Sequence, residues 1–285
     1  DDEFEGKCVY VWFEAVQGYL TCAQIWSERI AKEHPDGVGS WKNWWCVDND
    51  GNSPRHLYFL GKDNIPFHTV IWPALIMGLN MATNGLKSPR LPVEGDLHLE
   101  DNVPAMEYLM LAGGQFSKSR KHAIWLPSFL EKFDPDTLRY VLTINMPEAH
   151  DTDFNWSDFV DKVNTELIAA YGNYVHRIMT LTSRLPSENG ASPLAPFDDI
   201  SINSEHSKKL EEIHSSITDS LVRHRYKEAL RTAMSAAQYG NQMIQAAAPW
   251  AHLSADENSI ERKKSLSVLA FGWRIARFLS IVILV

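Results

Sequence analysis

The first half of the chain alternates short apolar runs with helical patterns. Residues 8–13 form an apolar run rich in β-branched and aromatic side chains, which predicts a buried parallel strand. Apolar positions then recur at helical spacing over 16–30, and residues 56–60 predict a second strand. Residues 80–103 are rich in turn formers and predict a loop. Strand, turn and helix in succession predict an α/β fold with a parallel sheet and crossover helices.

The helix after the second predicted strand has clear local determinants. Asp63 or Asn64 is expected to cap it, and Pro66 suits its first position. We expect the helix to run to about Leu79 and to be kinked by Pro73, because proline removes a backbone donor.

From Asp134 onward the chain is predominantly helical. Asp134 caps a predicted helix over 137–145, and Ser157 opens a long one. Residues 185–196 predict a linker rich in proline, serine, asparagine and glycine, and the last helix begins near Ser259. We therefore expect an antiparallel helical bundle from about residue 158 to the end.

An apolar stripe with spacings of three and four supports the bundle. It consists of Val160, Val163, Leu167, Tyr171, Tyr174, Ile178 and Leu181. Gly172 and Gly240 lie inside helices, where each glycine costs about 1 kcal/mol relative to alanine, which indicates close packing.

Composition narrows the classes of protein. The 285 residues carry 27 Lys+Arg and 36 Asp+Glu, and this net charge of −9 argues against general DNA binding. Three cysteines provide neither a disulfide framework nor zinc spacing, which favours a reducing cytoplasm. We expect no membrane span. The apolar tail 268–285 is interrupted by Arg274 and Arg277, and we interpret it as a core helix cut short by the chain end.

Polar and aromatic side chains follow both predicted strands. Ligands of open parallel sheets bind beyond the carboxyl ends of the strands. A carboxylate beside aromatic walls suits an amino acid, whose ammonium it would bind. Alternative roles are a plain helix cap for Asp63 and core positions for His68 and the indoles. The candidate residues are Trp12, Ala15, Tyr19, Asp63, Asn64, His68 and Trp72.

A second candidate site lies at residues 113–120. Paired glycines precede Ser117, Lys118 and Ser119, and such a loop can bring an ammonium and hydroxyl donors to a polyphosphate. The alternative is a solvated basic loop.

Together these segments resemble the class I methionyl-tRNA synthetases from about residue 6 to about residue 250. Residues 11–15 with Gly18 and Tyr19 resemble the family's methionine-pocket segment, and 59–73 is a long, nearly family-specific match. Residues 115–119 resemble the signature lysine loop KMSKS, and 248–250 resemble the proline-tryptophan of the anticodon-binding bundle.

The resemblance implies a role for each candidate residue. Asp63 would bind the methionine ammonium with Asn64 beside it, and a Tyr19 hydroxyl and a His68 N–H would recognise the thioether. Trp12, Ala15, Tyr19, His68 and Trp72 would enclose the side chain. Lys118 would be catalytic and would bind ATP with Ser117 and Ser119. Asn173, Arg177 and Trp250 would contact the tRNA anticodon.

The resemblance also implies domains, substrates and location. Residues 1–114 would be half of a Rossmann-like catalytic domain, 115–157 the lysine-loop and stem-contact region, and 158–285 the α-helical anticodon-binding domain. The substrates would be L-methionine, ATP with Mg²⁺ and tRNA(Met), with no membrane or DNA partner, in the cytoplasm.

Three departures from the family define what this chain can do alone. The histidine-rich HIGH turn is absent from the 285 residues, and so is a cysteine cluster for zinc, which we expect only in an upstream part. Gln115 replaces the first signature lysine. We expect a C-terminal fragment that is inactive alone, and pyrophosphate exchange by the isolated chain would contradict this. Two alternatives stay open: a synthetase for another apolar amino acid, and a non-catalytic tRNA-binding module.

Overall fold

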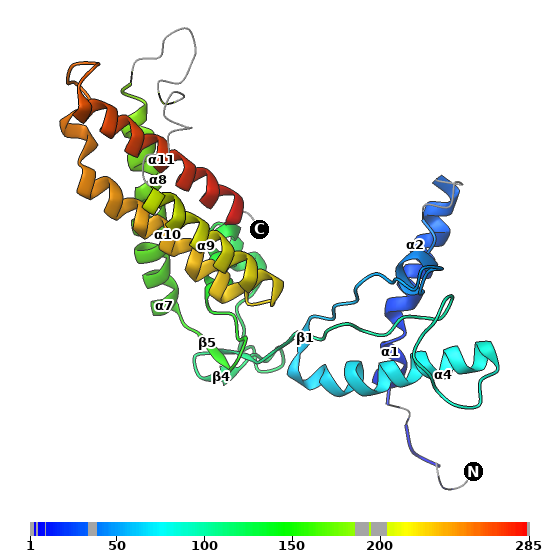
Figure 1. Cartoon of the computed structure of the whole chain (residues 1–285). Helices are drawn as coiled ribbons and strands as arrows, with labels where there is room; N and C mark the ends of the chain where they lie inside the picture. Colours follow the sequence, from blue (N-terminus) through cyan, green and yellow to red (C-terminus); the bar gives the residue numbers. More distant parts are fainter. Residues whose placement is uncertain are drawn as a thin grey trace. The chain divides into compact units, whose positions relative to one another are not determined.

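The chain forms two compact units, Asp1–Tyr108 and Leu109–Val285, each with its own core (Figure 1). The computed structural model describes residues 3, 5–8, 10–33, 39–185, 194 and 204–283. Val9 of the first predicted strand, and the predicted linker except for residues 185 and 194, lie outside the described residues. The predicted division into three segments stays a prediction.

The first unit places a parallel strand pair beside a long helical segment. Strands β1 and β2 pair in parallel, with Leu60 opposite Ala105 and Gly61 opposite Met106. The crossover between them contains the longest apolar helix of the unit, as the sequence predicts. The elements are α1 (Trp12–Ala15), α2 (Gly18–Glu33), α3 (Lys42–Trp45), β1 (Leu60–Gly61), the 3₁₀ helix η2 (Lys62–Asn64), the π-helix η3 (Phe67–Ile71), α4 (Trp72–Asn84) and β2 (Ala105–Met106).

The prediction of a buried strand at residues 8–13 is wrong. In the described part of this run the chain turns into α1, and Tyr10 and Val11 are exposed. The backbone N–H of Phe13 donates to the Tyr10 carbonyl at 3.1 Å, and that of Ala15 donates to Val11 at 3.2 Å. A strand needs a partner for its backbone groups. Here these groups are satisfied locally instead, so β propensity alone does not produce a strand.

Three details of the following helix also differ from the prediction. Neither Asp63 nor Asn64 caps it: both lie in η2, and η3 begins after Pro66 without a side-chain cap. The turn before Pro73 is π-helical, and we attribute this wider turn to the missing proline N–H and the bulk of its ring. The helix continues to Asn84 and ends at Gly85, whose left-handed φ of 62° is typical of a helix C-terminus.

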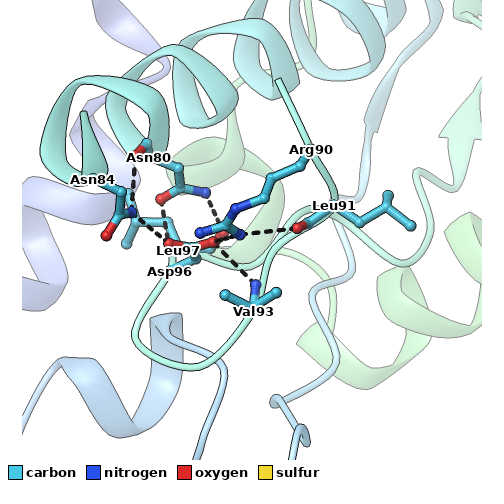
Figure 2. A network of polar contacts seen from close by, with 7 residues as sticks. All are labelled: Asn80, Asn84, Arg90, Leu91, Val93, Asp96 and Leu97. Carbon is cyan, nitrogen blue, oxygen red and sulfur yellow. Dashed lines mark hydrogen bonds and ion pairs between the residues drawn. The ribbon is translucent and has the colours of Figure 1, made fainter. Parts of the chain in front are cut away.

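A buried carboxylate connects the end of α4 to the loop that follows (Figure 2). Asp96, only 3% exposed, accepts hydrogen bonds from the Asn84 amide at 2.7 Å and from the Val93 N–H at 3.0 Å, and it forms an ion pair with Arg90. Asn80 exchanges two hydrogen bonds of 2.9 Å with the Leu97 backbone. This network fixes the helix that carries Trp72.

The second unit begins with a small sheet of order β4-β3-β5 and continues into helices. Strands β3 and β5 are parallel, whereas β3 and β4 form an antiparallel hairpin. The elements are β3 (Leu109–Leu111), β4 (Gly114–Gln115), α5 (Leu126–Leu130), α6 (Pro135–Ile144), β5 (Thr152–Phe154), α7 (Trp156–Asp161), the π-helix η4 (Lys162–Gly172), α8 (Asn173–Thr182), α9 (Ser204–Val222), α10 (Tyr226–Ala247), the 3₁₀ helix η6 (Pro249–Ala251) and α11 (Ile260–Val282).

The helix caps follow the sequence closely. The Asp134 carboxylate accepts from the Asp136 N–H at the start of α6, and Ser259 caps α11. The long helix begins at Trp156, one residue before the predicted opening at Ser157, because Asn155 supplies the cap. Its predicted stripe is buried at Tyr174, Ile178 and Leu181 and half-buried at Val163, Leu167 and Tyr171, whereas Val160 is exposed.

Residues of α8, α9, α10 and α11 form the bundle core, and Figure 1 shows these helices gathered in the second unit. The apolar C-terminal segment is a core helix, as predicted: Leu269, Ile275 and Leu279 are fully buried. Among the described residues, Lys62–Asn84 and Ile260–Val282 are long and apolar enough to span a membrane by length and composition alone. Core helices of soluble proteins can have the same length and composition, so the expectation of no membrane span stays a prediction.

We expect Gly240→Ala to destabilise the bundle and Gly172→Ala to be tolerated. A Cβ at Gly240 would lie 2.4 Å from the ring of fully buried Tyr174, whose hydroxyl donates to the Gly272 carbonyl at 2.6 Å. Overpacking of this kind costs about 1–3 kcal/mol, which exceeds the gain in helix propensity of about 1 kcal/mol. A Cβ at Gly172 would meet only the Leu167 carbonyl oxygen, at 3.4 Å. Urea denaturation measures both variants, and equal stability would contradict this packing.

Candidate functional site

A hydrogen-bonded chain of side chains connects α2 to η3 in the first unit. The Nδ1 of buried His68 lies 2.9 Å from the Asn64 carbonyl oxygen, and its Nε2 lies 2.9 Å from the Tyr19 hydroxyl. A carbonyl only accepts, so Nδ1 donates to Asn64, which leaves Nε2 to pair with the Tyr19 hydroxyl. Both ring nitrogens are therefore engaged, and this geometry does not leave the predicted His68 N–H free for a thioether sulfur.

Aromatic rings surround this hydrogen-bonded chain. The Tyr58 ring lies 5.1 Å from the Tyr19 ring and 5.5 Å from the His68 ring, measured between centroids. The indole N–H of buried Trp72 donates to the Tyr58 hydroxyl at 3.1 Å. Burial raises the pKa of Tyr58, and the bond from Trp72 only partly opposes this, so the phenol stays neutral. Tyr19, His68 and Trp72 thus meet around Tyr58, a residue that the sequence analysis did not select.

The other residues of the predicted amino-acid site lie outside this cluster, in which His68 and Trp72 are buried and Tyr19 is 45% exposed. Trp12 packs by its ring against Phe67, at 5.8 Å between centroids, yet remains 42% exposed. Ala15 is exposed and Asn64 is half-buried. Trp12 therefore lies against the start of η3, and the described residues do not form a closed indole-lined cavity with it.

Asp63 lies in η2, two residues after the end of β1, and is exposed to solvent. Its Oδ2 accepts a hydrogen bond from the hydroxyl of Tyr108, which follows β2. Lys62 forms an ion pair with Glu107 and lies over the Tyr108 ring. The carboxylate at the strand end is thus available to a ligand. The described contacts do not join it to Trp12 or Trp72.

The candidate phosphate loop forms a tight turn in the second unit. Ser117 and His122 exchange two backbone hydrogen bonds, of 2.9 Å and 3.0 Å. The Ser117 and Ser119 hydroxyl oxygens are 3.2 Å apart, and Lys118 is exposed at the tip. An exposed ammonium beside two hydroxyls can reach an anion, although the hydroxyls bond to each other here.

The paired glycines before this turn have structural roles. Gly113 has a φ of 78°, which glycine adopts readily, and its N–H donates to the Asp153 carboxylate at 2.7 Å. A Cβ at Gly114 would lie 3.1 Å from Nε2 of His122, which donates to the Leu111 carbonyl. The glycines therefore allow a hairpin and a close histidine contact.

The three residues predicted to contact an anticodon come together on the bundle. The guanidinium carbon of Arg177 lies 5.6 Å from the centroid of the Trp250 ring, which is 44% exposed. Arg177 donates to Gln245 at 3.0 Å and to Asn241 at 3.5 Å. Asn173 lies one helical turn before Arg177 on α8. Helices α8 and α10 and η6 therefore supply one surface.

An open groove of about 860 Å³ runs along this surface. Its lining is rich in side-chain amides, which can donate to and accept from the edges of unpaired bases. Arg177 is the charged residue of its lining. The groove is lined by Ala169, Asn173, Arg177, Asn241, Gln242, Gln245 and Ala246. The amides of α10 were not selected from the sequence, although their spacings of one, three and four place them on one helix face.

Comparison with known proteins identifies the family. The family model described as tRNA synthetases class I (M) matches residues 2–179, and the chain belongs to this family. The mixed α/β unit with parallel strands and the helical C-terminal part match its fold, which confirms the predicted fold class.

Among the described residues, no group of three or more histidine, cysteine or acidic side chains is placed to hold a metal ion.

Relatives of known name cover most of this chain. A methionine–tRNA ligase of Dehalococcoides mccartyi is 38% identical over 274 residues, which is 96% of this chain and 44% of the relative. One of a Roseiflexus species is 38% identical over 258 residues, 90% of this chain and 40% of the relative. The chain thus spans less than half the length of these curated relatives.

A solved structure agrees in fold. Mycobacterium tuberculosis methionyl-tRNA synthetase in complex with methionyl-adenylate superimposes with a TM-score of 0.68, at 20% identity. The match covers 96% of this chain and 47% of that one.

Proposed function

We propose that this chain is the methionine- and tRNA-recognising part of a methionine–tRNA ligase. The whole enzyme would activate L-methionine with ATP and Mg²⁺ to methionyl-adenylate and transfer it to tRNA(Met) in the cytoplasm. The observation that carries the proposal is 38% identity to methionine–tRNA ligases over 96% of the chain. The exposed carboxylate of Asp63 and the exposed ammonium of Lys118 would supply the charges that this chemistry requires.

The first unit would recognise methionine by charge and by aromatic contact. Asp63 would bind the ammonium, while Tyr19, His68 and Trp72 would line the side-chain pocket with Trp12, Ala15 and Asn64. Because both His68 nitrogens are engaged, we assign thioether recognition to the aromatic rings, since sulfur makes favourable contacts with ring edges. A bound methionine would displace water from Trp12.

The second unit would supply charge stabilisation and tRNA recognition. Lys118, with Ser117 and Ser119, would stabilise negative charge on the ATP phosphates while the methionine carboxylate attacks the α-phosphorus and pyrophosphate leaves. The protein contributes mainly position and electrostatics to such a transfer. Asn173, Arg177 and Trp250 would contact the anticodon.

Equilibrium dialysis of this chain with radiolabelled L-methionine tests the amino-acid assignment. We expect saturable binding that excess methionine displaces and that equimolar leucine, isoleucine or valine does not. Preferential displacement by a branched amino acid would assign the site to another synthetase. No saturable binding would overturn the assignment.

We expect Trp250→Ala to weaken binding of a tRNA(Met) anticodon stem-loop about 5- to 150-fold, because stacking of a base on an aromatic ring contributes about 1–3 kcal/mol. Fluorescence anisotropy with a labelled stem-loop measures the change. Trp273→Ala is the matched control, since Trp273 is a similarly exposed indole (40%) on α11. Equal losses in both variants would count against the anticodon role.

A further inference from the structure

The residues that follow strands β1 and β2 contact each other in two pairs. Parallel strands β1 and β2 end at Gly61 and Met106, and their carboxyl ends lie side by side. Lys62 then forms an ion pair with Glu107. The next residues pair as well: the Tyr108 hydroxyl donates to Oδ2 of Asp63.

The Tyr108 hydrogen bond constrains the carboxylate. It occupies Oδ2 and leaves Oδ1 for a second donor, such as an ammonium. Lys62 Nζ lies 4.3 Å from the centroid of the Tyr108 ring, and this cation–π contact holds the ring in place. A group fixed before its ligand arrives loses less conformational entropy on binding.

The Lys62–Glu107 ion pair keeps the Lys62 ammonium from competing with a ligand ammonium for Asp63. Lys62 is adjacent to Asp63 in sequence, and its ammonium sits over the ring whose hydroxyl bonds that carboxylate. A free ammonium there would pair with Asp63 and compete with a ligand ammonium. Glu107 instead binds Lys62, with both side chains about one-third exposed (31% and 34%).

We infer that Tyr108 and the Lys62–Glu107 pair are positioning residues for Asp63. Tyr108 orients the carboxylate toward the ammonium of the amino-acid substrate, and Glu107 keeps Lys62 from neutralising it. This inference rests on the proposed role of Asp63 as the ammonium ligand. It assigns Tyr108, Lys62 and Glu107 a role that acts through the Asp63 carboxylate.

Binding of two ligands to the whole chain tests the role of Tyr108. L-Methionine carries the ammonium, whereas 4-(methylthio)butanoate lacks it and keeps the thioether and carboxylate. We expect Tyr108→Phe to weaken methionine binding about tenfold, the value of one hydrogen bond to a charged group, and to leave binding of the analogue within about twofold. Tyr10→Phe, an exposed tyrosine of the same unit, is the matched control.

A rescue experiment tests the role of the ion pair. We expect Glu107→Gln to weaken methionine binding several-fold, because it frees Lys62 to pair with Asp63. Adding Lys62→Met to this variant removes the competing charge and should restore part of the affinity, while the part that depends on the cation–π contact with Tyr108 stays lost. A purely structural role for the pair predicts a further loss instead.

The outcomes separate this inference from the proposed function. Methionine binding by the wild type, with unchanged affinity in Tyr108→Phe or equal losses for both ligands, overturns the inference alone. Absence of rescue by Lys62→Met overturns the part assigned to Glu107. Absence of methionine binding by the wild-type chain overturns the proposed function, and the inference with it.

Discussion

Asp63→Ala is expected to weaken methionine binding by this chain about 30- to 100-fold and to abolish methionine activation by the whole enzyme. Removing one partner of a hydrogen-bonded charge pair costs about 2–5 kcal/mol when the pair is buried. Asp63 is exposed in this structure, and solvent screening places the effect at the lower end of that range. Equilibrium dialysis gives the affinity, and methionine-dependent pyrophosphate exchange gives the activation rate.

Two further variants define what the loss means. Asp63→Asn keeps the shape and an acceptor for Tyr108 but removes the charge, so we expect it to bind methionine nearly as weakly as Asp63→Ala. Asp50→Ala removes an exposed carboxylate of the same unit and should leave binding unchanged. Near-normal methionine affinity in Asp63→Ala would refute the assignment of the ammonium site.

Asp96→Ala is expected to lower the free energy of unfolding of the first unit by about 3 kcal/mol, the lower end for breaking a buried ion pair. The substitution leaves the Val93 N–H, the Asn84 amide and Arg90 without their acceptor (Figure 2). The side chain of Arg90 is 36% exposed and can be hydrated, which limits the loss. Urea denaturation, combined with hydrogen exchange of α4, measures it.

The pH dependence of stability provides a separate check on Asp96. Burial alone would raise the pKa of Asp96, but the hydrogen bonds from Val93, Arg90 and Asn84 outweigh it and hold the pKa below its ordinary value. The stabilisation is therefore complete above the ordinary aspartate pKa of about 3.9 and is lost as the pH falls through the lowered folded-state pKa. Asp96→Asn should lack this acid-dependent loss. An unchanged acid profile in that variant would contradict the assignment.

Much of the candidate chemistry could be predicted because its determinants are local. His68 and Trp72 share a helix segment, and the spacing of Asn173 and Arg177 places them on one face of α8. The geometry around them could not be predicted. The partner of Asp63 is Tyr108, which is 45 positions away in the sequence. The partners of Arg177 are Asn241 and Gln245, which are 64 and 68 positions away.

The sequence by itself determined the helices whose ends are fixed by their own residues. Asp134 and Ser259 cap helices because a short side chain reaches the nearest free N–H groups, whatever the rest of the chain does. The apolar stripe through Tyr174 and Ile178 likewise requires a partner surface, and the bundle provides it.

Only the tertiary structure decided whether residues 8–13 form a strand and which oxygen of Asp63 remains open. A strand depends on backbone partners from another segment, and in the described part of this run Trp12 and Phe13 belong to helix α1 instead. The orientation of a carboxylate depends on which donor arrives from a distant strand end. Pairing between β1 and β2 brings Tyr108 to Asp63. The residues next to Asp63 in the sequence do not determine this contact, because it depends on a residue 45 positions away.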